Sequence, residues 1–324
     1  MKQVSSRLHA GKMPIFWLAI LIALPFIVKN IYYLHLANAA IILIILTVGL
    51  NLLTGYAGQI SIGHAAFYGI GAYASAFMTV RLGWSFWVAL PLSGLLCSGI
   101  GYLIGKPTLK LRGAYLAIAS IGVGEITRLV LINWSQVTGG AEGFKGIPSP
   151  KLFKFALDSD FRYYWLLASI LVVVYFLANR LIDSEIGRAF RAVREEEIAA
   201  EFMGADTANL KVRVFMISTF LAGIAGCLMA HMDGYLSPFS FNFTQSVAYL
   251  MMALAGGLGS KWGPIVGVLL LTYAKEAFRF FNDYQLVIYG LLLVLLIVFM
   301  PKGVCGSIKD LYLKLAGSRG KNGR

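Results

Sequence analysis

The chain has 324 residues, of which 58% are hydrophobic and 13% are charged, and its mean hydropathy is +0.74. A soluble domain carries roughly 25% charged residues, so this composition excludes an ordinary soluble protein and indicates several membrane spans. The net charge of +13 is spread among loops and tails between apolar runs, which favours membrane topology over nucleic-acid binding as its explanation.

The N-terminus combines Lys2, Arg7 and Lys12 with the apolar run FWLAILIALPFIV, a pattern also found in cleavable secretory signals. The apolar character resumes almost at once in AAIILIILTVGLNLL, which begins at Ala39. We therefore interpret the first run as an uncleaved membrane span.

The sequence predicts an all-α polytopic membrane protein, with one transmembrane domain over 1–324 and a membrane region over 14–301. Crossing the bilayer takes roughly 20 apolar residues. About ten runs approach this length, at 14–34, 36–54, 60–80, 84–105, 113–133, 163–182, 212–233, 243–259, 262–280 and 285–301. Glycine gathers at 55–83 and 243–265, so we expect broken or re-entrant helices there.

An even number of spans places both tails, 1–13 and 302–324, on the same side as the loop at 183–211. That side receives 19 of the 28 lysines and arginines. By the positive-inside rule it is cytoplasmic, and the loop at 134–162 is then periplasmic.

The sequence has no GxxxxGK[ST] phosphate loop, no HExxH and no nucleophile elbow. Cys97, Cys227 and Cys305 lack metal-ligand spacing. We therefore expect no enzyme activity, no metal and no cofactor, and any ATP that drives this protein must be bound by other chains.

Residues 49–78 combine many glycines with polar side chains inside an otherwise apolar region. Small residues recur there every four positions in two series. The first is Ser61, Ala65 and Gly69, and the second is Gly71, Ser75 and Thr79. Such faces let helix backbones approach closely in lipid, so a tightly packed helix accounts for most of the glycines.

Packing does not account for the polar residues of the same region. Asn51, Gln59, Ser61 and His64 are candidates for a solute route, because burial without partners would cost each of them several kcal/mol. The glycine-rich break at 55–58 fits a discontinuous helix that lines such a route. For His64, a packing role with satisfied hydrogen bonds is the competing interpretation.

The fifth run contains Glu125 and Arg128, which are three residues apart and so share a helix face. An ionisable side chain at mid-depth costs about 2.5–3.5 kcal/mol, so Glu125 should face protein or water. Glu125 is a further route candidate. Mutual neutralisation by Arg128 is the alternative, and a proton-coupled secondary transporter would use the same pair for coupling.

Residues 184–209 read SEIGRAFRAVREEEIAAEFMGADTAN and predict two short helices joined near Glu195. Ser184 is a suitable N-cap, and the change from arginine to glutamate complements a helix C-terminus followed by a helix N-terminus. Gly204 is suited to a left-handed C-cap. Ile186, Phe190 and Val193 form an apolar ridge, and the acidic cluster favours docking to a partner protein over anionic lipid.

Four stretches resemble the M-type inner-membrane permeases of ATP-binding-cassette importers for branched-chain amino acids. They are GLNLLTGYAGQISIGHAAFYGIGAYASA, GAYLAIASIGVGEITRLVLINW, the segment from SEIGRAFRAVREEE onward, and MMALAGGLGSKWGPIVGVLLL. Together they cover most of residues 48–272. Related permeases for urea and short amides share these motifs and remain the alternative substrate class.

The resemblance implies a multi-pass protein of the bacterial inner membrane that forms half of a translocation pathway. Its partners would be a second permease, two cytoplasmic ATP-binding subunits, a periplasmic solute-binding protein, the solute and membrane lipid. The loop that seats in the ATPase matches at Gly187, Arg191, Glu197, Ala199, Ala200 and Gly204, with Phe190 on its apolar ridge. The triple glutamate at 195–197 departs from the family pattern, in which Asn or Asp is expected among the acids.

Overall fold

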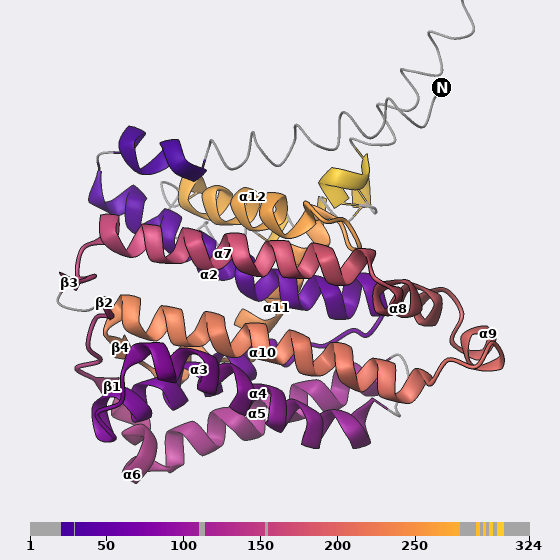
Figure 1. Cartoon of the computed structure of the whole chain (residues 1–324), viewed down its shortest axis with the longest axis horizontal. Helices are drawn as coiled ribbons and strands as arrows, with labels where there is room; N and C mark the ends of the chain where they lie inside the picture. Colours follow the sequence, from indigo (N-terminus) through magenta and orange to yellow (C-terminus); the bar gives the residue numbers. More distant parts are fainter. Residues whose placement is uncertain are drawn as a thin grey trace, which may run out of the picture.

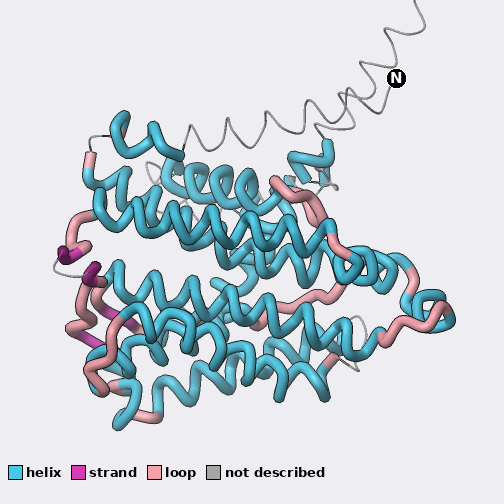
Figure 2. Tube along the Cα trace, viewed as in Figure 1, coloured by secondary structure: helices cyan, strands magenta, loops and turns pink. Residues whose placement is uncertain are grey.

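The computed structural model is a bundle of helices that run along a common direction (Figure 1), with short strands gathered at one end (Figure 2). It describes residues 21–28, 30–109, 114–152 and 155–278, and also 290–291, 294–295, 298–300 and 303–307. The predicted tail at 1–13, most of the predicted tail at 302–324 and most of the last predicted span at 285–301 lie outside the described residues.

The elements follow one another as helices with few interruptions. The α-helices are α2 (Ile31–Leu50), α3 (His64–Ala76), α4 (Phe86–Thr108), α5 (Ala114–Asn133), α6 (Ser135–Thr138), α7 (Asp160–Asp183), α8 (Glu185–Glu195), α9 (Glu197–Phe202), α10 (Thr207–Asp233), α11 (Phe243–Gly256) and α12 (Gly263–Ala277). Two π-helical segments, η1 (Asn51–Tyr56) and η2 (Phe77–Arg81), extend α2 and α3, and η3 (Gly140–Glu142) and η4 (Pro238–Ser240) are 3₁₀ turns.

The strands are two residues long and lie between helices. β1 (Phe144–Lys145) pairs antiparallel with β4 (Tyr235–Leu236), and β2 (Lys151–Leu152) pairs antiparallel with β3 (Phe155–Ala156). The first pair joins the loop after α5 to the segment after α10. The strands therefore order the loops at the end of the bundle opposite α8 and α9 (Figure 1).

Five described helices are long and apolar enough to cross a membrane: Ile31–Tyr56, Phe86–Thr108, Tyr115–Asn133, Asp160–Asp183 and Thr207–Asp233. The all-α membrane class is therefore confirmed. Three of the other predicted spans contain α3, α11 and α12. α3 continues through η2 to Arg81, and α11 and α12 are 14 and 15 residues long. α11 and α12 are each shorter than the roughly 20 residues that a spanning helix needs. The count of ten spans stays a prediction.

Side-chain caps set where several of the long helices begin. Asn30, Ser85, Ser159 and Asn242 each accept a hydrogen bond from a first-turn backbone N–H, at α2, α4, α7 and α11 respectively. These residue types are preferred N-caps because their short side chains reach the unpaired N–H groups. The residue at which each of these helices begins is thus set by a cap that is adjacent in sequence.

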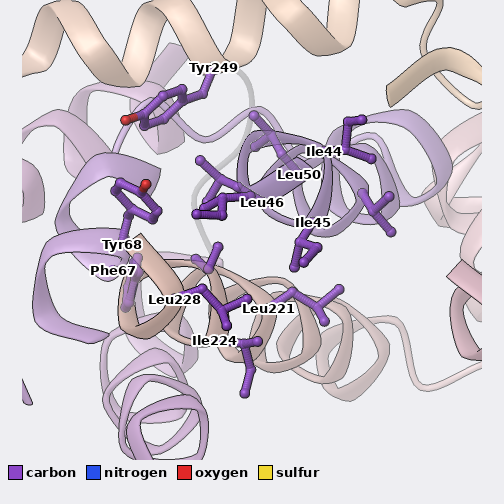
Figure 3. Packing of buried hydrophobic residues seen from close by; sticks show 14 of the residues in the cluster. Ile44, Ile45, Leu46, Leu50, Phe67, Tyr68, Leu221, Ile224, Leu228 and Tyr249 are labelled. Carbon is purple, nitrogen blue, oxygen red and sulfur yellow. The ribbon is translucent and has the colours of Figure 1, made fainter. Parts of the chain in front are cut away.

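The core lies between α2 and α10, the two most buried of the long helices. Ile45, Leu46 and Leu50 of α2 face Leu221 and Leu228 of α10 (Figure 3). Phe67 and Tyr68 of α3 and Tyr249 of α11 close the same cluster. These two helices therefore form the frame on which the shorter helices are placed.

Small residues let α3 lie directly against α10, as the sequence predicts. A Cβ on Gly71 would come within 2.4 Å of the Gly223 carbonyl oxygen of α10, so only glycine permits this approach. Ser75 and Thr79 on the same face are buried and return their hydroxyl hydrogen bonds to backbone carbonyls of their own helix. The second small-residue series is therefore a packing surface.

Candidate functional site

The loop that carries α8 and α9 protrudes from one end of the bundle (Figure 1). Its start is fixed by Ser184, whose hydroxyl caps α8 by accepting from the Gly187 N–H at 3.3 Å. A Cβ on Gly187 would lie 2.3 Å from the Leu181 carbonyl oxygen, so glycine is needed where α8 turns off α7. α9 follows after Glu196, and Gly204 has a φ of +87°. The predicted helix pair and its left-handed end are confirmed.

One face of the α8–α9 loop is packed against the bundle. Phe190 is 1% exposed, and Val193 and Ala200 are also buried. The prediction that the apolar ridge of Ile186, Phe190 and Val193 inserts into a partner is therefore wrong for Phe190 and Val193, because α8 lies on the rest of the chain and turns these two side chains inward. Ile186 remains 41% exposed. Phe190 and Ala200 hold the loop in place from inside.

The outward face of the α8–α9 loop carries a different set of apolar side chains. Phe202 and Met203 are 87% and 88% exposed, and Ile198 is half exposed on the same turn of α9. Ala199 is exposed beside them. We call Ile198, Phe202 and Met203 the tip cluster. The sequence does not reveal this cluster, because α9 has only six residues, which are too few for a periodic pattern to assign a face.

Polar contacts fix the loop to its neighbours. Arg191 donates to the carbonyl oxygens of Gly187 and Ile182, at 3.3 and 3.2 Å, which ties α8 to the end of α7. Lys211 of α10, only 4% exposed, lies 2.5 Å from the carboxylate of Glu197. Glu197 thus has an internal partner at the start of α9.

Asp206 caps α10 at the end of the loop. Its side chain accepts from the backbone N–H of Asn209 at 3.1 Å. Hydrogen bonds from the Asn209 backbone and side chain lower the pKa of this carboxyl, because they stabilise its charged form. Both ends of the loop are therefore anchored by capping residues.

Ser61 and His64 lie inside the bundle, at the start of α3. The Nδ1 atom of His64 lies 3.1 Å from the Ser61 hydroxyl oxygen, and its Nε2 atom lies 2.7 Å from the hydroxyl oxygen of Ser218 on α10. The His64 side chain is fully buried. Ser246 of α11 accepts from the Ala65 N–H at 3.1 Å. These contacts join α3, α10 and α11.

Asn51 begins the π-helical segment η1, and Gln59 lies in the short connection that follows it. Asn51 is 3% exposed, and its amide bonds to the backbone of the loop between α11 and α12. Gln59 is half-buried, and its side-chain amide donates to the Ala57 carbonyl oxygen at 3.3 Å. The polar candidates at 51–64 therefore make contacts within the chain.

The hollow beside these residues is small. Gln59, Ser61 and Ser120 line a cavity of about 10 Å³, which is about the room that one water needs. Two larger hollows, of about 400 and 480 Å³, lie along α7 and are lined mainly by aliphatic and aromatic side chains. None of the polar candidates at 51–64 lines either of these two larger hollows.

Glu125 lies on α5, which is the least buried of the long helices. Arg128 Nε donates to both carboxylate oxygens of Glu125, at 3.1 and 3.0 Å. The Glu125 side chain is half exposed, and Ile118, Ile126 and Leu129 share its exposed side. The structure therefore presents a charged pair on an otherwise apolar helix face. Among the described residues, no group of His, Cys, Asp or Glu side chains is arranged to hold a metal ion.

The described part of the chain is a helical bundle in which five helices are long and apolar enough to cross a membrane, and this defines a multi-pass membrane protein. The family model described as "Branched-chain amino acid transport system / permease component" matches residues 32–297. The chain belongs to this family.

Individual relatives agree with the family match. The chain is 37% identical to the high-affinity branched-chain amino acid transport system permease protein LivM of Salmonella typhimurium, over 94% of this chain and 76% of that protein. It is 36% identical to LivM of Escherichia coli K12, over 94% and 77% of the two chains. The permease LivH of Escherichia coli K12 is 25% identical over 81% of this chain and 90% of its own length. No solved structure matches the chain.

Proposed function

We propose that this chain is the membrane-spanning permease subunit of an ATP-binding-cassette importer that carries leucine, isoleucine and valine across the bacterial inner membrane. The LivM relatives are named as permeases of high-affinity branched-chain amino acid transport, and they cover nearly the whole chain. ATP hydrolysis on partner subunits drives the transport, and the chain itself supplies the route.

The single observation that carries the proposal is the exposed tip cluster on the α8–α9 loop. Phe202 and Met203 are almost fully exposed at the far end of a loop whose other face is packed on the bundle. By the charge distribution this end is cytoplasmic. Large apolar side chains held out in water fit insertion into a partner's groove, and the partner that a permease of this kind needs there is the ATP-binding subunit.

Glu125 supports a second partner. A charged pair exposed on a spanning helix is costly in lipid, so the exposed side of α5 faces protein or water in the working complex. A second related permease would cover this side of α5 with protein, and a solute route between the two chains would supply the water. The separate LivM and LivH permeases among the relatives fit an importer with two kinds of permease. We propose that Glu125 borders this route.

The four candidates at 51–64 receive a different role in the proposal. Ser61 and His64 join three helices through hydroxyl contacts, and Asn51 joins α2 to the loop after α11. Gln59 stabilises the turn between η1 and α3, because its carbonyl oxygen accepts from the Thr54 hydroxyl and its side-chain amide donates to the Ala57 carbonyl oxygen. We propose that these residues hold the helices that form the wall of the route, with their side chains turned away from the solute.

The test is uptake into proteoliposomes that contain this chain, its neighbouring permease and two ATP-binding subunits, with the periplasmic binding protein outside. Labelled leucine should accumulate only when ATP is enclosed, and omission of the ATP-binding subunits should abolish accumulation. Robust uptake by the permeases alone would contradict the proposal.

Two further arms separate the alternatives. ATP-driven accumulation of labelled urea without leucine would keep the architecture and replace the substrate class. Uptake that stops when an ionophore dissipates the proton gradient, with ATP still enclosed, would place the function with secondary transporters and give Glu125 and Arg128 the coupling role.

A further inference from the structure

Three separate parts of the chain meet at the inner end of the α8–α9 loop. Arg194, near the end of α8, donates from Nη1 to the carbonyl oxygen of Gly55 in η1. Asn51, at the start of η1, accepts from the Gly259 N–H and donates to the Ser260 carbonyl oxygen, both at 2.9 Å. These contacts join α8, the end of α2 and the loop between α11 and α12.

The three segments pack so closely at this junction that glycine backbone lies directly against its neighbours. A Cβ on Gly55 would lie 2.4 Å from the Gly259 nitrogen, which no side chain can occupy. Gly259 has a φ of +75°, and a Cβ there would lie 2.7 Å from Arg194 Nη1. The stem of Arg194 lies over Gly58, where a Cβ would lie 3.0 Å from Arg194 Cγ. Displacement of any one of the three segments therefore displaces the others.

The charges and hydrogen bonds at this junction are complementary. The guanidinium of Arg194 lies at the carbonyl end of the α2–η1 helix, where a positive charge is favoured. Asn51 is 3% exposed and uses both its carbonyl oxygen and its amide nitrogen. A π-helical segment such as η1 often marks a functional position in a helix, because its wider turns are less stable than the α form.

The loop between α11 and α12 also contacts the start of the α8–α9 loop. Its Lys261 ammonium group lies 2.7 Å from both carboxylate oxygens of Asp183, the last residue of α7 before α8 begins. The short loop between α11 and α12 therefore contacts Asp183, just before α8 begins, and η1, which Arg194 contacts from the end of α8.

We infer that Arg194 and Asn51 are positioning residues that transmit the state of the docked ATP-binding subunit to the membrane helices. Arg194 connects the α8–α9 loop to Gly55, and Asn51 connects the same helix end to the loop that joins α11 and α12. This inference rests on the proposed function, because it takes the α8–α9 loop as the docking site. We call Arg194, Gly55, Asn51 and Gly259 the transmission node.

Arg194→Ala tests the node in the reconstituted complex. It removes a charge-assisted hydrogen bond, which is strong enough to shift a two-state equilibrium about tenfold. The amount of leucine taken up per ATP hydrolysed should fall about tenfold, while the ATP-binding subunits still co-purify. Arg194→Lys keeps the charge and can still donate a hydrogen bond, so it should restore part of the ratio.

Arg162→Ala is the matched control. Arg162 also donates to a backbone carbonyl oxygen, that of Ala156, but it lies at the start of α7, outside both the α8–α9 loop and the node. Uptake per ATP of Arg162→Ala should equal that of the wild type. Asn51→Asp is the second variant, in case Arg194→Ala fails to assemble. It keeps the acceptor for Gly259, loses the donor to Ser260, and should uncouple the complex in the same way.

Hydrogen exchange gives a readout that does not depend on the solute. In the wild-type complex, a non-hydrolysable ATP analogue should change amide exchange in 51–58 and 257–262, and Arg194→Ala should abolish this change in 257–262. An unchanged nucleotide response together with a normal uptake ratio in Arg194→Ala would overturn the inference. A wild-type complex that takes up no amino acid would refute the proposed function, and the exchange comparison would still decide the node.

Discussion

The ammonium group of Lys211 lies 2.5 Å from the carboxylate of Glu197, which joins the first residue of α9 to the first turns of α10. Lys211 is almost fully buried, so its charge depends on this carboxylate for compensation. Glu197 therefore orders the α8–α9 loop from within the chain.

We predict that Glu197→Lys abolishes transport and that the double variant Glu197→Lys, Lys211→Glu restores most of it. Breaking a buried ion pair from one side costs about 3–5 kcal/mol, whereas exchange of the two charges keeps the pair. Uptake and loop proteolysis in proteoliposomes measure the effect. If Glu197 instead made its essential contact with the ATP-binding subunit, the double variant would remain inactive.

Two phenylalanines of the α8–α9 loop should respond in opposite ways to a charge. Phe202→Glu places the charge on the exposed tip cluster, so the thermal stability of the permease should stay normal while co-purification of the ATP-binding subunits is lost. Phe190→Glu places it in the packed interior and should lower stability, because an unpaired buried charge is costly. Ala208→Glu, exposed near the start of α10, is the control for added charge.

Normal capture of the ATP-binding subunits by Phe202→Glu would contradict the docking role of the tip cluster. Thermal unfolding of each purified permease, followed by pull-down with tagged ATP-binding subunits, separates the two effects. The same pair of measurements serves for all three variants.

His64→Ala should destabilise the assembled permease by roughly 2–5 kcal/mol, since it leaves a cavity and removes the partner of Ser218. The expected result is a lower melting temperature and less assembled complex. The complex that does assemble should keep its uptake per ATP. Normal stability with lost uptake would show instead that His64 contacts the solute.

Glu125→Gln should impair the permease more than the double variant Glu125→Gln, Arg128→Gln. The single change leaves the Arg128 guanidinium without its carboxylate on an apolar helix face, and the double change removes both charges. Insertion yield and ATP-driven uptake measure the difference. Equal loss of uptake at normal yield in both variants would assign Glu125 a direct role in the route.

Local signals in the sequence predicted the α8–α9 loop well. Three signals act only on the backbone groups beside them, so their effects can be predicted without knowing the fold. They are the cap at Ser184, the change of charge at Glu195 and the glycine at 204. The face of α8 that would be buried could not be read in this way. Phe190 lies on an apolar ridge in either arrangement, and only the position of α8 against the bundle decides whether the ridge faces outward.

Long-range polar contacts account for most of what the sequence did not predict. Asn51 was recognisable as a polar residue that needed partners, but its partners, Gly259 and Ser260, lie 208 and 209 residues away. No local pattern specifies such a pair. The extents of α11 and α12 were predicted closely, because the apolar runs at 243–259 and 262–280 agree with Phe243–Gly256 and Gly263–Ala277 to within three residues at each end.

α10 joins the two ends of the molecule. Its 27 residues correspond to about 40 Å of continuous helix, which exceeds the roughly 30 Å of a hydrocarbon core. It begins beside α9, where Lys211 holds Glu197, and it leads directly into β4, which pairs with β1. One continuous helix therefore connects the α8–α9 loop at one end of the bundle with the strands at the other. A change in the tilt of α10 at either end would move the structures at both ends.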